Sequence, residues 1–245
     1  MAIRMGLLGK KIGMTQAFND KGIWTAICAI ETGPCVVLEV LTPERDGYSA
    51  IRLGFDEAKP RNVSKPRLGQ FVRANTSPKR YVREIRLTPE EAGKFELGQT
   101  VNVDEVFQAG DIIAVTGVSN GKGFQGVIKR HHYHGTRATH GTHEAFRHGG
   151  SIGCRLTPGR VWKGKPMPGQ MGNKRVTVQN VKVVEVLADR NLLLLGGGIP
   201  GSPMSYVMVH QGAKHAPRPF VARPAPQPEP APQPEPESEP APETA

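Results

Sequence analysis

Aromatic residues, cysteines and extended apolar segments are all scarce in this sequence. Aromatics make up only 6% of the 245 residues, which argues against a base-stacking platform spread over a sheet. The cysteines, Cys28, Cys35 and Cys154, are odd in number and widely spaced, so they predict no disulfide framework and fit a reducing cytosol. Cys28 and Cys35 lie inside apolar runs and should be buried. No apolar run reaches the roughly 18 residues of a membrane span, and the N-terminal one is too short for a signal peptide, so we expect a cytoplasmic protein with no membrane partner.

Acidic residues are nearly absent between Ser119 and Arg175. This stretch holds one acid, Glu144, and the eleven basic residues Lys122, Lys129, Arg130, Arg137, Arg147, Arg155, Arg160, Lys163, Lys165, Lys174 and Arg175. Between Lys129 and Lys174 there is neither a helical nor an alternating apolar period, so this part cannot bury a face of its own. Such a long loop is typically functional or disordered, and its positive charges repel one another in water. We therefore predict an irregular, glycine-rich basic extension that becomes ordered when RNA neutralises it.

Basic residues also dominate the remainder of the chain except at its C-terminal end. The formal net charge is +10, but residues 224–245 contain five glutamates and no Lys or Arg, so residues 1–223 carry +15. A basic body with an acidic tail indicates a nucleic-acid binder. Residues 217–245 hold eleven of the 22 prolines and predict an extended, disordered Pro/Glu-rich tail.

Short strand patterns separated by turn residues occupy most of the chain outside the basic stretch. They recur from residue 4 to residue 55, at 80–87, at 101–106, at 112–118 and again from 176 to 211. This spacing is typical of a mainly β fold, a barrel or sandwich, rather than of alternating β-α units. Because strands lie on both sides of residues 119–175, we expect the body to close around the ends of an extension formed by that stretch.

Residues 56–80 are polar, basic and interrupted by prolines, and predict an irregular excursion from the body. Its cations either contact a polyanion or face solvent, and the sequence favours neither reading: Lys59, Arg61, Lys65, Arg67, Lys79 and Arg80. After it, Thr88, Pro89 and Glu91 have the spacing of a capping box and predict the start of a short helix.

Three patterns in the basic stretch suggest chemistry. The glycines Gly121, Gly123 and Gly126 have dinucleotide-fingerprint spacing, but basic residues follow where an amphipathic helix should begin, so a turn close to a neighbour or to phosphate is favoured. Six histidines cluster at His131, His132, His134, His140, His143 and His148. A metal site competes here with RNA contact and with simple exposure, and the surrounding positive charge disfavours the metal.

A tryptophan lies among several cations in the same stretch. Trp162 is surrounded by Arg155, Arg160, Lys163 and Lys165, which suits contact with splayed bases and phosphates, although Trp162 could instead cover the edge of the barrel. No Ser-His-Asp or Cys-His arrangement can be inferred, and Cys154 has no orienting acid. We expect no enzyme activity, no cofactor, no metal and no small-molecule substrate.

Four segments together resemble one protein family. They are GLLGKKIGMTQAF, GVSNGKGFQGVIKRHH, GGSIGCRLTPGRVWKGKPMPGQMGNKRVTVQN and RNLLLLGGGIPG. In this order they resemble the bacterial form of the large-subunit ribosomal protein L-three family, over residues 1 to about 212. The resemblance implies a six-stranded closed β-barrel, here residues 1–118 and 176–216, and an extension, residues 119–175, whose tip approaches the peptidyl transferase centre. It also implies binding to large-subunit ribosomal RNA, neighbouring large-subunit proteins as partners, and an early role in subunit assembly.

The resemblance and the charge pattern together give the expected site residues. The residues expected to bind ribosomal RNA are Lys10, Lys11, Lys122, Lys129, Arg130, His131, His132, Arg137, His140, Arg147, His148, Arg155, Arg160, Trp162, Lys163, Lys165, Lys174 and Arg175. The family implies that the tip consists of Gly149, Gly150, Ser151, Ile152, Gly153, Cys154 and Arg155. Two positions depart from the family pattern. Some relatives carry a methylated glutamine where this chain has Cys154, so that modification should be absent, and Ala114 replaces a usual Asp or Asn, which removes one local hydrogen bond.

Overall fold

A closed barrel of six antiparallel strands forms one half of the body. The computed structural model describes residues 5–18 and 22–212, so the predicted tail at 217–245 lies outside the described residues. The barrel strands follow the order β1-β12-β7-β10-β11-β2, and β2 pairs back onto β1. Their bounds are β1 (Gly6–Phe18), β2 (Trp24–Thr32), β7 (Ile112–Val118), β10 (Arg175–Leu187), β11 (Leu192–Gly196) and β12 (Tyr206–Gln211). The expected mainly β fold is confirmed.

A second sheet forms the other half of the body. It has the order β5-β4-β3-β6, with bounds β3 (Cys35–Leu41), β4 (Ala50–Glu57), β5 (Lys79–Arg86) and β6 (Thr100–Val101). The expectation that residues 1–118 contribute all their strands to the barrel is therefore wrong. Residues 35–101 pair among themselves because β3, β4 and β5 are consecutive antiparallel neighbours and β6 returns to pair with β3.

The segment 56–80 is more regular than its composition predicts. It contains η1 (Pro60–Asn62) and the nine-residue helix α2 (Lys65–Arg73). Phe71 of α2 is buried against Leu38 of β3 and Val82 of β5, so one apolar contact fixes a helix that is otherwise polar. The expectation of an irregular excursion is corrected by this helix.

One hydrophobic core joins the barrel to the second sheet. Side chains from β1 and β2, such as Leu7 and Cys28, lie in the same buried cluster as Cys35 and Leu53 of the second sheet. Both cysteines are buried, as expected, and burial raises the pKa of Cys35 to about 12. The alternating apolar residues of these strands supply the shared core because successive side chains point to opposite faces of a strand.

Short helices mark the turns of the body. They are α1 (Pro43–Asp46), α3 (Pro89–Ala92), α4 (Val103–Val106) and η3 (Ala188–Arg190). The predicted capping box is confirmed, since the Thr88 side chain accepts from the backbone of Glu91 and the Glu91 side chain accepts from the backbone of Thr88. The strand expected over 101–106 is wrong: β6 ends at Val101 and α4 follows.

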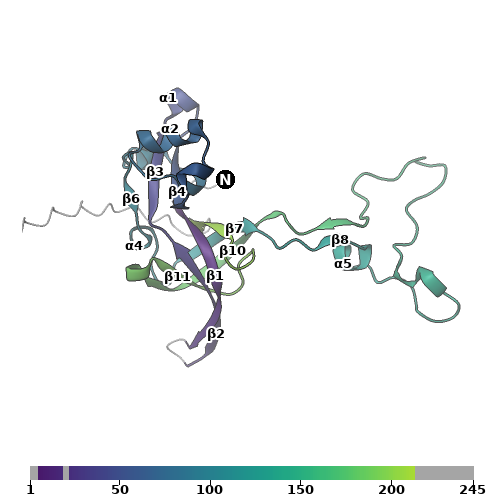
Figure 1. The fold of residues 1–245 in the computed structure, drawn as a ribbon. Coiled ribbons are helices and arrows are strands. Elements are labelled where there is room, and N and C mark those ends of the chain that lie inside the picture. The colour runs from purple at the N-terminus through teal and green to yellow at the C-terminus, as the bar shows by residue number, and fades with distance from the viewer. Residues whose placement is uncertain (1–4, 19–21, 213–245) are drawn as a thin grey trace, which may run out of the picture.

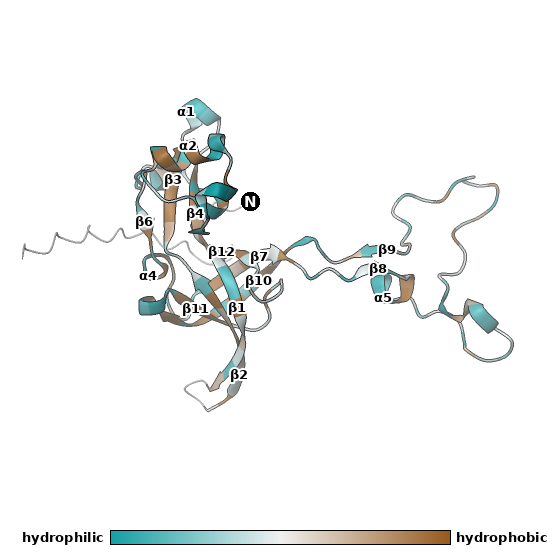
Figure 2. Ribbon diagram, in the orientation of Figure 1, coloured by the Kyte–Doolittle hydropathy of each residue, from teal (hydrophilic) through white to brown (hydrophobic). Residues whose placement is uncertain are grey.

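Residues 119–175, called the arm below, leave the body between β7 and β10 and project far from it (Figure 1). The arm contains β8 (Gly123–Gln125), α5 (Val127–His131), η2 (His143–Arg147) and β9 (Gly169–Met171). Figure 2 shows apolar residues gathered in the strands of the body and few along the arm. Within residues 5–18 and 22–212, no helix is long and apolar enough to cross a membrane.

Candidate nucleic-acid interface

Two barrel strands continue into the stem of the arm. Beyond the last β7–β10 pair, Ser119 donates its N–H to the Lys174 carbonyl at 2.9 Å, and Lys122 donates to the Met171 carbonyl at 2.9 Å. The ladder then runs on through β8 and β9, where Gly123 faces Met171 and Gln125 faces Gly169. The stem is therefore a two-stranded ribbon anchored in the barrel.

The arm divides into two loops at α5. Arg130 Nη1 and His131 Nε2 both donate to the Met167 carbonyl, at 2.7 and 3.1 Å. At the start of the helix, Gly149 approaches Val127 so closely that an added Cβ would lie 3.3 Å from its Cγ2. These contacts close one loop over residues 132–148 and a second over residues 150–166.

Two glycines are needed where the backbone of the arm approaches itself. Gly172 has φ +73°, and a Cβ there would lie 2.0 Å from the Asn120 carbonyl oxygen. Gly135 has φ +75°, and a Cβ would lie 2.4 Å from the Phe146 carbonyl oxygen. A side chain at either position would combine an unfavourable backbone conformation with a steric clash.

Burial is almost absent from the arm. Val127 is the one buried residue between Ser119 and Arg175, all of which the structure describes. The prediction that this segment cannot bury a face of its own is confirmed. Its shape is set by the stem ladder and by a few backbone hydrogen bonds, such as Thr136 N–H to the Phe146 carbonyl at 3.1 Å.

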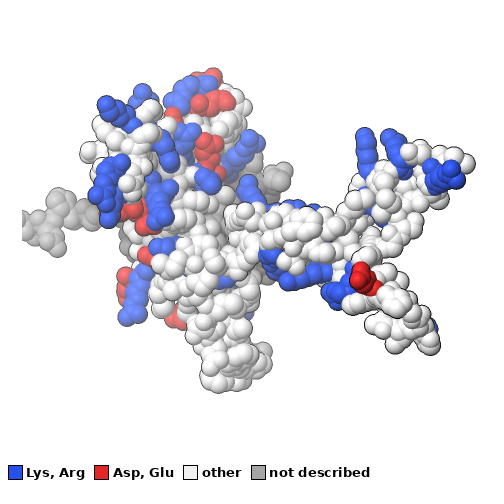
Figure 3. Space-filling model, turned by 45° about the vertical axis from the view of Figure 1, so that its right-hand side comes forward, with Lys and Arg blue, Asp and Glu red and all other residues white. Residues whose placement is uncertain are grey.

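The cations of the arm are free of ion pairs. Every ion pair among the described residues lies in the body, where Arg52 alone contacts both Glu39 and Glu84. Figure 3 accordingly shows blue and red mixed over the body, but a single acidic patch on the arm. Nine of the eleven arm cations are exposed, and the two half-buried ones are Arg130 and Lys165. Unpaired, solvated cations on an extended ribbon are available to a polyanion.

Lys10 and Lys11 lie in the body rather than in the arm. Lys11 is only 7% exposed, and its Nζ donates to the carbonyls of Ile199 at 2.8 Å and Gly201 at 3.0 Å. The prediction that Lys11 binds RNA is wrong, because its ammonium group is buried and already donates to these two carbonyls. Lys10 is partly exposed, with its Nζ 4.0 Å from Asp56 Oδ2, and stays a predicted RNA contact.

The other predicted RNA-binding residues all lie on the arm. The second loop carries Arg155, Arg160, Trp162, Lys163 and Lys165. Its tryptophan, Trp162, is 61% exposed. The tryptophan therefore does not cover the edge of the barrel. The predicted tip, residues 149–155, is also exposed, and Cys154 is the exposed member of the three free cysteines.

Two large apolar side chains of the arm that were not in the predicted RNA-binding set are even more exposed than Trp162. Phe124 in the stem is 75% exposed and Leu156 in the second loop is 84% exposed. The sequence could have indicated them, because each is a large apolar side chain in a segment that has no core. Such a side chain is available to contact another molecule.

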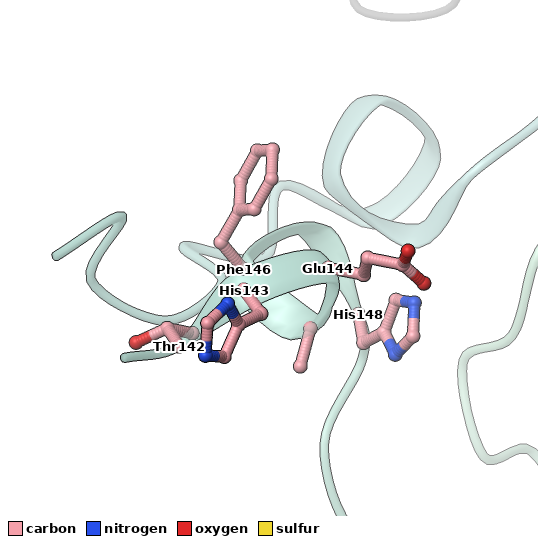
Figure 4. A pocket seen from close by; sticks show the side chains of 6 residues that line it. Thr142, His143, Glu144, Phe146 and His148 are labelled. Atoms are coloured by element: carbon pink, nitrogen blue, oxygen red, sulfur yellow. The ribbon is translucent and has the colours of Figure 1, made fainter. Parts of the chain in front are cut away.

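The histidine cluster does not assemble into a metal site. Within the described parts of the chain, no group of three or more His, Cys, Asp or Glu side chains could hold a metal ion. Around η2 the chain forms an open hollow lined by Thr142, His143, Glu144, Phe146 and His148, with Ala145. Figure 4 shows His143 and Phe146 pointing in different directions from this turn rather than converging on one point. The arrangement suits contact with an extended partner better than capture of an ion.

The glycine-rich spacing also leads to no nucleotide fold. Gly123 and Gly126 border the three-residue strand β8, and α5 after them is five residues long. No parallel strand pairs with β8, whose one partner among the described residues is antiparallel β9. A dinucleotide site needs a β-α-β unit with a full helix at this position, so the glycines serve the ribbon.

The cations of residues 56–80 form a separate surface on the body. Lys59 precedes η1 and Arg61 lies in it, Lys65 and Arg67 lie in α2, and Lys79 and Arg80 lie in β5. Lys79 contacts Glu57 at 3.6 Å. Arg80 lies over the Tyr206 ring, 5.9 Å from its centre. Contact of this surface with a polyanion stays a prediction.

Ala114, one of the two departures from the family pattern, faces His210 across the β7–β12 pair. Burial lowers the pKa of His210 to about 4, and the positive charge of Arg175 at the base of the arm adds to this effect. An acidic side chain at position 114 would have lain beside this ring and favoured its protonated form. Alanine offers no such charge, and the histidine is neutral.

Known proteins of one family are similar to this chain over most of its length. The family model described as Ribosomal protein L3 matches residues 84–193. A large ribosomal subunit protein uL3 from Brachyspira hyodysenteriae is 46% identical over 210 residues, covering 86% of this chain and 95% of the relative. Proteins of the same description from Acidothermus cellulolyticus and Herpetosiphon aurantiacus are each 48% identical over 209 residues, covering 85% of this chain and 93% and 97% of the relatives. Identity at this level over nearly the whole length of the relatives shows that the chain belongs to the ribosomal protein L3 family.

Proposed function

We propose that this chain is a structural, non-catalytic constituent of the large ribosomal subunit, and that the arm binds large-subunit ribosomal RNA. The observation that carries the proposal is the state of the arm cations: nine are exposed and none takes part in an ion pair. The names of the relatives, all large ribosomal subunit proteins, support the same assignment.

The arm threads between RNA helices and neutralises phosphates that would otherwise repel one another. Lysine and arginine side chains fix its position, while Trp162 and the histidines contact bases and irregular backbone. The stem ribbon sets the direction of entry because it is continuous with β7 and β10. The tip at residues 149–155 then approaches the peptidyl transferase centre, and the body stays outside with neighbouring large-subunit proteins.

This role places the chain on the ribosome in the cytoplasm and early in assembly. An arm that buries almost nothing of its own gains stable contacts only while the surrounding RNA is still open enough to fold around it. We therefore expect the chain to bind before the RNA core of the subunit closes.

A binding competition tests the proposal. Labelled large-subunit RNA is bound to the full chain, and unlabelled duplex DNA or unlabelled large-subunit RNA is added. Specific binding predicts that the RNA competes at least tenfold better than the DNA, because A-form shape and splayed bases contribute beyond charge. Equal competition would reduce the arm to a general polyanion binder.

A further inference from the structure

The end of the β1–β2 hairpin projects from the barrel in a direction different from that of the arm (Figure 1). We call the projecting part of this hairpin, residues 12–18 and 22–26, the finger. Strand β12 pairs with β1 as far as Lys10, and β11 pairs with β2 as far as Ile27. Lys11 and Ala26 make the last backbone hydrogen bonds to these neighbours, with Ser205 and Met204 on one side and Gly197 on the other. From Met14 onward, in the described part of the chain, β1 pairs only with β2, and the last pairs before the turn are Ala17 with Thr25 and Phe18 with Trp24. The finger is thus a two-stranded ribbon outside the barrel.

One face of the finger is exposed and mostly apolar. Met14, Phe18 and Trp24 are 58%, 74% and 56% exposed. The register puts them on one face, because Phe18 and Trp24 are direct partners and Met14 lies four residues before Phe18; exposed Gln16, opposite Ala26, lies between them on the same face. An apolar strip of this kind on a folded body marks a binding surface.

The finger also has a free strand edge. Within the described residues, the ladder between β1 and β12 stops at Lys10, and Lys11 makes the last contacts on that side, with Met204 and Ser205. A bulge lies at the base, between Lys11 and Gly13, and the register from Met14 to Phe18 is regular. Proteins usually protect such an edge with charged residues, proline or a bulge along it, and residues 14–18 contain no proline or charge.

The charge of the finger separates it from the rest of the chain. Residues 12–18 and 22–30 contain no Lys, Arg, Asp or Glu, and Figure 3 shows this projection white. The segment that joins the two strands adds Asp20 and Lys21, whose formal charges cancel. An RNA surface is lined by phosphates, which need a net positive charge that this hairpin does not offer. A second copy of the chain is disfavoured because residues 1–223 carry +15 and would repel each other. The complementary surface is therefore apolar and uncharged.

We propose that the finger docks another protein of the large subunit, which adds a strand to the Met14–Phe18 edge and covers the face of Met14, Phe18 and Trp24. Backbone hydrogen bonds along the edge supply affinity, and the apolar face selects the partner. This inference rests on the proposed function, since it requires the chain to reside in the subunit. It adds a protein partner at a surface separate from the arm.

Photocrosslinking within the assembled particle tests the partner class. A photoreactive benzoyl-phenylalanine replaces Phe18, cells are irradiated, and purified large subunits are treated with ribonuclease before mass spectrometry. The matched control replaces Val72 of α2, which is 75% exposed and lies among cations. We expect one ribosomal protein to be captured from position 18 and not from position 72. An RNA adduct at position 18, a crosslink between two copies of this chain, or no adduct in assembled subunits overturns the proposal.

A double variant separates this inference from the proposed function. Phe18→Ser with Trp24→Ser should leave the affinity of the free chain for large-subunit RNA within about twofold of the original. In purified subunits, the same variant should lower the occupancy of the captured protein at least threefold, while Val72→Ser leaves it unchanged. A tenfold loss of RNA affinity in the double variant would make the finger an RNA contact and refute the inference. Failure of the unmodified chain to bind this RNA would instead refute the proposed function.

Discussion

Neutralising cations of the second arm loop should change the salt dependence of RNA binding in a way that can be calculated. The variant Arg155→Gln, Arg160→Gln, Lys163→Gln removes three of the nine exposed arm cations and alters no ion pair. Because these side chains have no internal partner, the fold of the body should be unaffected. The change therefore reports on contacts with RNA.

The expected magnitude follows from counterion release. Each neutralised phosphate contributes roughly 0.7 to 0.9 to the slope of log K against log salt. Nine contacts give a slope of about −6 to −8, so the affinity of the unmodified chain should fall roughly 10⁴-fold between about 50 and 200 mM salt. Removing three contacts should make the slope shallower by about 2 to 3.

Filter binding to large-subunit RNA at several salt concentrations measures this slope. The matched control is Lys94→Gln, Lys182→Gln, Arg190→Gln, which removes the same charge from exposed positions of the body. It should leave the slope within about 0.5 of the original value. If both variants change the slope equally, only net charge matters and the arm has no special place. A slope near zero for the unmodified chain would refute the reasoning altogether.

Three further predictions concern the body and the stem. Lys11→Met should lower the free energy of unfolding by about 2–4 kcal/mol, because two carbonyls that accept from its Nζ lose their donor; in denaturant unfolding, a loss no larger than that of Lys10→Met would contradict this. For His210, the lowered pKa means that the unfolded chain binds a proton first, so stability should fall between pH 6.5 and about 4 by on the order of 3 kcal/mol and level off below. His210→Gln should flatten that part of the profile, and an unchanged profile would count against the buried neutral ring. Gly172→Ala should weaken RNA binding at least tenfold without changing unfolding of the body, since its Cβ would strike the Asn120 carbonyl; Gly121→Ala, whose Cβ would lie 3.7 Å from Asn173, is the control and should bind normally.

Much of the local structure could be predicted from local sequence. The Thr88–Glu91 capping box, the strand at Ile112–Val118 and the burial of Cys28 and Cys35 each depend on neighbours within a few residues. The arm was recognisable because its charge and glycine content exclude a core over its whole length.

Long-range pairing could not be predicted in the same way. Lys10 and Lys11 are chemically identical and adjacent, and only the carbonyls of Ile199 and Gly201, far along the chain, make one of them internal. The division of strands between barrel and second sheet likewise depends on which edges meet in space. Helix α2 was not predicted because its polar, basic composition and Gly69 disfavour a helix, which a single buried phenylalanine stabilises; Pro66 lies in its first turn, where proline is well tolerated.

The central claim, that RNA surrounds the arm, can be measured from the chain's own thiol. Cys154 is exposed at the tip of the arm, whereas Cys28 and Cys35 are buried, so an iron chelate that generates hydroxyl radicals can be attached at Cys154 alone. After reconstitution into large subunits, we expect the radicals to cleave large-subunit RNA in a small set of positions around the peptidyl transferase centre. Intact RNA in that region, with cleavage confined to the particle surface or absent, would contradict the account.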